Sequence, residues 1–207
     1  MFEDRVDAGR QLAQLLDEHD VDIDVVLAVP RGGLPVGRAV ADAFDVPLDI
    51  VAAKKLGAPG NPELAIGAAA SDGSVWLNDG LIDRLGIGEG YVESERKRAA
   101  ETARQKVDRY RQGREEIDLA GKRVAIVDDG VATGATTTAC IERVKNADAA
   151  YVLLAVPVGP PDTVERLRGV ADEVICDETP PHFSAVGQFY RSFAQVTDEE
   201  AVAYLER

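Results

Sequence analysis

The stretch VAIVDDGVATGATT, residues 124–137, decides the fold of this chain. It opens with an unbroken apolar run, which is typical of a parallel strand buried on both faces. Two carboxylates, Asp128 and Asp129, follow at the carboxyl end of this run, and a loop of small residues then leads into a helix. This order of strand, acidic pair, small-residue loop and helix predicts an α/β unit with a ligand site at the end of the strand.

The loop after the acidic pair has the chemistry of a phosphate site. A helix amino terminus offers unpaired N–H groups and the positive end of the helix dipole. Hydroxyl groups add donors and small residues leave room for an anion; the predicted 5-phosphate-binding residues are Thr133, Gly134, Ala135, Thr136 and Thr137. Asp128 and Asp129 suit hydrogen bonds from vicinal sugar hydroxyls, so the stretch predicts a ribose 5-phosphate pocket. The alternative is an ordinary strand–turn–helix with an aspartate cap.

A second strand-to-helix turn lies in VVLAVPRGGLPVG, residues 25–37. Arg31 carries a guanidinium suited to phosphate oxygens. Gly32 and Gly33 let backbone N–H groups approach an anion closely. Such a turn could serve any α/β phosphate site, although the G-x-G-x-x-G of a dinucleotide fold does not follow this strand.

A third segment, LDIVAAKKLGAPGNPE at residues 48–63, places two lysines at the end of a predicted strand over 49–54. The Gly/Pro-rich residues from Gly57 to Glu63 predict a mobile loop that could act as a lid. Because strand residues alternate faces, we expect only one of Lys54 and Lys55 to face a site. The alternative is a solvated strand end followed by a surface loop.

These three segments resemble the motifs of the type I phosphoribosyltransferases, with a loop pattern similar to the adenine-type members. A further likeness, to a group of bacterial and archaeal proteins of this family without an assigned acceptor, rests on residues 8–10, 55–68 and 186–190. The resemblance implies a doubly wound parallel α/β sheet with a small carboxyl-terminal hood. It also implies phosphoribosyl pyrophosphate (PRPP) as a substrate and Mg²⁺ as a cofactor carried by PRPP, with no direct metal ligand and a water bridge to Asp128 and Asp129 allowed.

The resemblance also implies roles for single residues. Asp128 and Asp129 would bind the ribose hydroxyls, and Arg31, Gly32, Gly33 and Lys55 would bind pyrophosphate. Lys55 and Arg31 would act in catalysis, with Glu63 as a weak candidate for an acid/base group. Ala132 stands where hypoxanthine-type members place an aspartate, which argues against a 6-oxopurine acceptor handled in that way.

The expected function is therefore transfer of phosphoribosyl from PRPP to a nitrogen nucleophile, with a nucleobase as the expected acceptor and pyrophosphate as the product. The alternative is a non-catalytic protein that senses PRPP or a nucleotide. The segment 179–193 is rich in aromatic residues in a chain with 5% aromatics overall. In the predicted hood, about residues 177–196, the candidates for binding the base are Phe183, Gln188, Phe189 and Tyr190, with a satellite hydrophobic cluster as the alternative.

The composition limits the classes of partner. The formal net charge is −14, with 37 acidic against 23 basic residues, which argues against nucleic acid because phosphate neutralisation needs a basic surface. No apolar run approaches the length of a membrane span, and the first residues do not resemble a signal peptide. We expect a cytoplasmic protein with Cys140 and Cys176 as buried thiols. The acidic, lysine-poor surface resembles proteins of high-salt cytoplasm, with an ordinary acidic protein as the alternative.

The alternation of elements predicts one α/β domain over residues 1–207, and the resemblance implies that this domain is phosphoribosyltransferase-like. A charged helix at about 90–111 carries no predicted chemistry, and we expect it to pack by one edge or to contribute to a homodimer. The other elements are expected at about these positions: helices 4–18, 34–44, 79–85, 135–146, 161–168 and one signalled by a capping box at Thr197; strands 24–29, 65–70, 75–77, 150–157 and 173–176.

Overall fold

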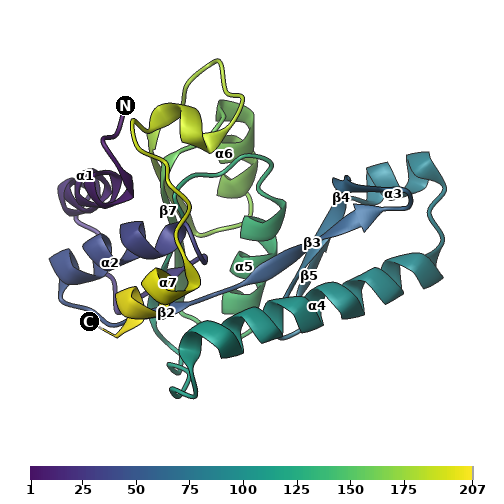
Figure 1. The fold of residues 1–207 in the computed structure, drawn as a ribbon, viewed down its shortest axis with the longest axis horizontal. Helices are drawn as coiled ribbons and strands as arrows, with labels where there is room; N and C mark the ends of the chain where they lie inside the picture. Colours follow the sequence, from purple (N-terminus) through teal and green to yellow (C-terminus); the bar gives the residue numbers. More distant parts are fainter. Residues whose placement is uncertain (207) are drawn as a thin grey trace.

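The computed structural model describes residues 1–206 and contains two sheets (Figure 1). The main sheet has five parallel strands in the order β2-β1-β6-β7-β8. Its strands are β1 (Val25–Ala28), β2 (Leu48–Ile50), β6 (Arg123–Val127), β7 (Tyr151–Val158) and β8 (Glu173–Glu178). This confirms the predicted parallel α/β sheet, in which connecting helices must cover both faces.

Helices cover the two faces of the main sheet because its apolar residues point alternately to each side. One face packs on α1 (Arg5–Glu18), α2 (Gly33–Phe44) and α7 (Asp198–Leu205). The other face packs on α5 (Ala135–Lys145) and α6 (Pro161–Arg168). The expected capping box is present at α7, where Thr197 Oγ1 accepts from Glu200 N at 3.1 Å and Glu200 Oε2 accepts from Thr197 N at 2.8 Å.

A second unit of structure extends from the main sheet as an arm (Figure 1). It consists of the antiparallel strands β3 (Ala53–Ala58), β4 (Asn61–Ala70) and β5 (Val75–Leu77), with α3 (Asp79–Leu85) and α4 (Glu89–Arg111). Leu56, Ile66 and Ala99 are buried where this small sheet packs on α4. The expected packing of α4 by one edge is confirmed, because Ala99, Ala103, Val107 and Tyr110 are buried.

Two sequence predictions in this region were wrong. The strand expected at 49–54 is two strands in different sheets, separated at Val51 and Ala52. The loop expected from Gly57 to Glu63 is a tight hairpin between β3 and β4. Gly60 takes a positive φ of 74° in the turn, and a Cβ at Gly57 would lie 2.6 Å from Pro62 Cα, so the glycines permit this close pairing.

The hood pairs with the amino terminus of the chain. Phe2 and Tyr190 form a parallel bridge with ring centroids 5.3 Å apart, and Phe2 N donates to Phe189 O at 2.8 Å. A short 3-10 helix (Val186–Phe189) forms the centre of the hood. Among residues 1–206, no helix is both long and apolar enough to cross a membrane.

The register of the main sheet positions the candidate site. Ala28 at the end of β1 pairs with Val127 at the end of β6. The Arg31-Gly32-Gly33 loop and the loop that begins at Asp128 therefore leave neighbouring strands at the same edge. In parallel α/β sheets, ligands bind at this carboxyl edge.

Candidate functional site

The two predicted phosphate loops press directly against each other. A Cβ at Gly32 would lie 2.0 Å from Asp129 Oδ2, and one at Gly33 would lie 2.7 Å from Val127 O. Since these distances are shorter than any real contact, a side chain at Gly33 would force the loops apart and one at Gly32 would displace the Asp129 carboxylate. The structure thus brings together the acidic pair and the Arg31-Gly32-Gly33 loop, which are about a hundred residues apart in the sequence.

The predicted 5-phosphate loop forms the start of α5. Gly134, with φ 72°, is the residue before the first turn, and Thr138 N and Thr138 Oγ1 both donate to its carbonyl, at 2.8 and 2.9 Å. On the outer side, Thr163 Oγ1 donates to Ala132 O at 2.9 Å and Arg166 donates to Thr133 O. These contacts use carbonyl groups of the loop and not its N–H groups.

Asp128 and Asp129 have different partners. Asp128 Oδ1 accepts from Asp129 N at 2.8 Å, whereas Asp129 Oδ2 accepts from Arg5 Nε at 2.7 Å. Burial raises the pKa of Asp128, and the neighbouring charge of Asp129 raises it further. Burial also raises the pKa of Asp129, and the hydrogen bond from Arg5 reduces this rise without cancelling it. Asp129 is thus an ion-paired carboxylate, and Asp128 is a carboxyl group held where its charge is costly.

Arg5 was missed by the sequence analysis. Its Nη1 also donates to Ala194 O at 2.7 Å, and its guanidinium lies 3.8 Å from the centre of the Phe193 ring. It therefore ties α1 to the hood and to the acidic pair at once.

Arg31 is engaged by the carboxyl-terminal helix. Arg31 Nη1 donates to Asp198 Oδ1 at 3.2 Å, and the same carboxylate accepts from Tyr110 Oη at 2.6 Å and from Arg109 Nη1 at 3.2 Å. These contacts lower the pKa of Asp198, the hydrogen bond from Tyr110 most strongly. In this structure the carboxylate of Asp198, on α7, accepts a hydrogen bond from the guanidinium of Arg31, the group that was predicted to bind pyrophosphate.

A cavity of about 460 Å³ lies between β3, α4 and the first turn of α5. Both Lys54 and Lys55 line it, together with Glu63 and Thr136. The expectation that only one lysine would face a site is therefore wrong. β3 is an edge strand, so long side chains from both of its faces reach the same cavity around its free edge.

The hood residues are largely occupied with one another. Gln188 Oε1 accepts from Ser184 N at 3.0 Å and Ala185 N at 3.3 Å, and its Nε2 donates to His182 O at 3.2 Å. Tyr190 is buried, and its hydroxyl donates to Asp129 O at 2.6 Å. Phe183 and Phe189 stack at 5.4 Å. In this state the group is the satellite hydrophobic cluster of the alternative interpretation, and Gln188 would have to exchange partners to bind a base.

The packing of the hood also explains why a glycine, Gly130, follows the acidic pair. A Cβ on this residue, whose φ is 153°, would lie 2.8 Å from Val186 Cγ1 and 3.0 Å from Val158 Cγ1. The glycine therefore lets the hood approach the acidic pair closely.

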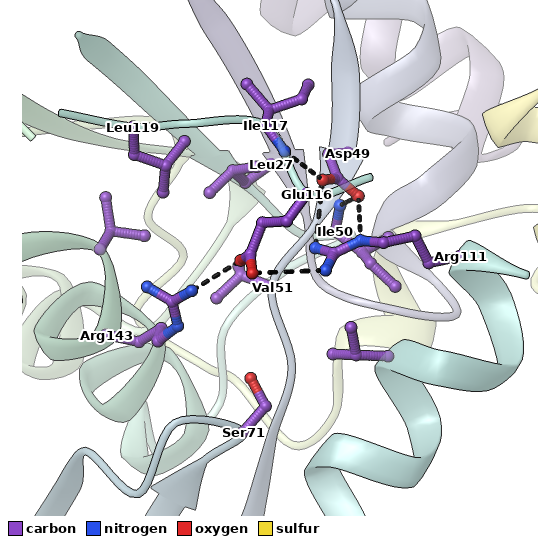
Figure 2. A pocket seen from close by; sticks show the side chains of 12 residues that line it. Leu27, Asp49, Ile50, Val51, Ser71, Arg111, Glu116, Ile117, Leu119 and Arg143 are labelled. Atoms are coloured by element: carbon purple, nitrogen blue, oxygen red, sulfur yellow. Dashed lines mark hydrogen bonds and ion pairs between the residues drawn. The ribbon is translucent and has the colours of Figure 1, made fainter. Parts of the chain in front are cut away.

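A second, much smaller cavity lies away from the candidate site, and a network of ion pairs lines it. This cavity has room for about one water, with a volume of about 10 Å³, and lies beside β2 (Figure 2). Figure 2 shows Asp49, Arg111, Glu116 and Arg143 joined in a chain of ion pairs, with Arg111 Nη2 at 3.1 Å from Asp49 Oδ2 and Arg143 Nη2 at 2.6 Å from Glu116 Oε1. This network connects α4 and α5 to the main sheet.

Within residues 1–206, no group of three or more histidine, cysteine or acidic side chains could hold a metal ion. The carboxylates of Asp128 and Asp129 supply hard oxygen atoms of the kind that Mg²⁺ prefers. The pair fits a magnesium ion that brings most of its ligands with a phosphate compound, and it does not form a complete protein cage.

Comparisons with known proteins identify the family of this chain. Residues 2–193 match the sequence model of the phosphoribosyl transferase domain. Two Mycobacterium tuberculosis proteins named as candidate phosphoribosyl transferases are 47% identical over the whole chain, which spans 47% of their length. A hypoxanthine/guanine phosphoribosyltransferase of Methanothrix thermoacetophila is 26% identical, over 72% of this chain and 58% of its own.

A solved structure from Thermus thermophilus shares the whole architecture. It is 40% identical, with a TM-score of 0.85 over 99% of this chain and 97% of its own. The chain thus spans about half the length of the curated relatives it matches and nearly all of this solved structure. The match of residues 2–193 and the 47% identity show that the chain belongs to the phosphoribosyl transferase family.

Proposed function

We propose that this chain is a Mg²⁺-dependent phosphoribosyltransferase that transfers phosphoribosyl from PRPP to a nitrogen nucleophile, with a nucleobase as the proposed acceptor. The observation that carries the proposal is the contact between the two loops, in which Gly32 leaves room for Asp129. A sugar-binding acidic pair, a guanidinium loop and a helix terminus then meet at one sheet edge, in an order that matches a sugar with a phosphate at one end and a diphosphate at the other.

In the proposed reaction, a nitrogen lone pair forms the bond to the anomeric carbon. The bond from that carbon to pyrophosphate breaks, its electron pair leaves on the pyrophosphate oxygen, and the nitrogen releases its proton to a base or to water. Asp128 and Asp129 would orient the ribose hydroxyls, and the loop from Thr133 to Thr137 would bind the 5-phosphate. Such positioning lowers the barrier by fixing the reacting atoms before the reaction.

Negative charge grows on the leaving group as the bond breaks. Arg31, the amides of Gly32 and Gly33, and Lys55 would stabilise it electrostatically. Mg²⁺ bound to PRPP would neutralise part of the same charge. Glu63 is exposed on the rim of the cavity and is the candidate to accept the proton. Because Asp198 pairs with Arg31 in this structure, PRPP must compete with that carboxylate.

The test is a screen for pyrophosphate release that depends on PRPP and Mg²⁺, across purines, pyrimidines and other amines. We expect PRPP with Mg²⁺ to raise the melting temperature and at least one nitrogen compound to release pyrophosphate. Stabilisation by PRPP without release for any acceptor would favour the sensing alternative. Absence of both effects at millimolar PRPP would contradict the proposed site.

A further inference from the structure

The long helix α4 contributes one lysine to the candidate site. Lys106 Nζ donates to Pro30 O at 3.4 Å, and Pro30 directly precedes Arg31. Lys106 is half-buried and lines the 460 Å³ cavity together with Lys54 and Thr136. It therefore lies between the Arg31 loop and the first turn of α5, although 76 residues separate it from Pro30.

The lysines of this cavity stand out in an acidic protein. Among the ion pairs of residues 1–206, none within 4.0 Å involves Lys54, Lys55 or Lys106, although the chain has 37 acidic residues. By contrast, Lys97 on the same helix pairs with Glu93 at 3.3 Å. Lys54 and Lys55 are exposed, whereas Lys106 is partly buried. A partly buried ammonium has three donors and is costly to desolvate without an opposite charge.

The local electrostatics point the same way. Burial lowers the pKa of Lys106, the nearby charges of Lys54 and Arg31 lower it further, and Asp128 opposes them. Cationic groups from β3, α4 and the loop before α2 thus concentrate positive charge at this point. An anion bound here would attract all of these cationic groups and so offset the repulsion among them.

We propose that Lys106 binds the diphosphate group of the ligand and that Lys54 supports it from the edge of β3. The identity of the ligand rests on the proposed function, whereas the anion site itself rests on the cavity and its lysines. Of the ligand's two phosphate ends, the diphosphate is favoured because Lys106 contacts the residue before Arg31. Lys106 would then share the leaving-group charge with Arg31 during transfer.

The test is calorimetric titration of the full chain with three probes in the presence of Mg²⁺: pyrophosphate, ribose 5-phosphate and PRPP. Lys106→Met keeps the length of the side chain and removes its charge, Lys106→Arg keeps the charge, and Lys97→Met is the matched control on the same helix. We expect Lys106→Met to weaken the binding of pyrophosphate and of PRPP at least tenfold. The binding of ribose 5-phosphate should weaken less than twofold. Lys106→Arg should recover part of the loss, and Lys97→Met should bind all probes like the parent.

The outcomes separate this inference from the proposed function. Parent protein that binds pyrophosphate but not PRPP would contradict the proposed function and leave the Lys106 comparison intact. Three results would overturn the inference: unchanged pyrophosphate binding by Lys106→Met, an equal loss for ribose 5-phosphate, or no pyrophosphate binding by the parent at millimolar concentration. Equal melting temperatures of parent and variant would show that a loss of binding is not a loss of fold.

Discussion

At the scale of single residues, the two adjacent carboxylates at the end of β6 differ in their surroundings. Asp129 has the Arg5 guanidinium as a partner at 2.7 Å, and Asp128 has the backbone N–H of Asp129 at 2.8 Å. One carboxylate is therefore balanced by an opposite charge, whereas the other depends on a neutral donor. This difference predicts opposite effects on stability for the same change of aspartate to asparagine.

For Asp128→Asn we expect a higher melting temperature at pH 7 together with at least tenfold weaker PRPP binding. The pKa of Asp128 is raised in the folded state, so the folded protein holds this proton more tightly than the unfolded chain. The stability cost of ionisation thus appears as pH rises above about 4, the value for an unfolded aspartate, and is absent below it. Asparagine removes the cost and keeps the acceptor for Asp129 N. Melting curves of the parent and of Asp128→Asn should be recorded from pH 4 to 8. The increase in melting temperature of the variant over the parent should disappear toward pH 4.

For Asp129→Asn we expect the free energy of unfolding to fall by about 3 kcal/mol, because the partly buried Arg5 loses its charged partner. The side chains of Arg5 and Asp129 are only 11% and 14% exposed, so water cannot replace the ion pair fully. Urea unfolding of both variants at pH 7 provides the comparison. Equal changes in the free energy of unfolding would contradict the distinction between the two carboxylates.

The close packing around Gly130 leads to a further prediction, because it leaves no room for a side chain at this position. We expect Gly130→Ala to destabilise by about 2 kcal/mol, since a strained backbone conformation adds to the overlap with Val186 and Val158. Gly90, near the start of α4, has open space around it, so Gly90→Ala should change stability by less than about 1 kcal/mol. Thermal unfolding of both variants is the measurement, and a loss as large at Gly90 would show that the effect at Gly130 is not one of packing.

At the scale of elements, the sequence predicted what local patterns encode. Helices α3 and α6 have the expected bounds, and four strands of the main sheet, β1, β6, β7 and β8, were found from their apolar runs. The hairpin of β3 and β4 was missed because glycine and proline suggest a loop, whereas here they permit close pairing. Arg5, Lys106 and Asp198 were missed for another reason. Arg5 lies 124 residues from Asp129, and Asp198 lies 167 residues from Arg31, so only tertiary folding brings them together.

The ion-pair network in Figure 2 predicts how α4 is fixed to the main sheet. Asp49 is buried and accepts from Ile50 N at 2.8 Å as well as from Arg111. Asp49→Asn should destabilise by about 3 kcal/mol, because it leaves the charge of Arg111 poorly paired. As a control, Glu165→Gln removes an exposed pair with Arg168 and should cost less than about 1 kcal/mol. Similar urea midpoints for the two variants would contradict the structural role of the network.

At the scale of the whole molecule, both ends of the chain reach the candidate site. α1 supplies Arg5 to the acidic pair, and α7 supplies Asp198 to Arg31. The protein carries a net charge of −14, so a bound polyanion depends on the cationic groups gathered near Arg31 and Lys106. Asp198 opposes that local charge, and its exchange for a ligand phosphate would couple α7 to binding.

Asp198→Asn should therefore bind Mg²⁺-pyrophosphate about twofold to fivefold more tightly than the parent, the scale of one exposed ion pair. Asp42→Asn is the control, since Asp42 pairs with Arg38 on α2 at 2.6 Å and should leave binding unchanged. The difference between the Asp198 variant and the parent should shrink from about 0.1 M to about 1 M salt, because salt screens exposed charges. Calorimetric titration at both salt concentrations measures this. Weaker binding by Asp198→Asn would show instead that Asp198 holds Arg31 in its binding position, which would make α7 a fixed wall of the site.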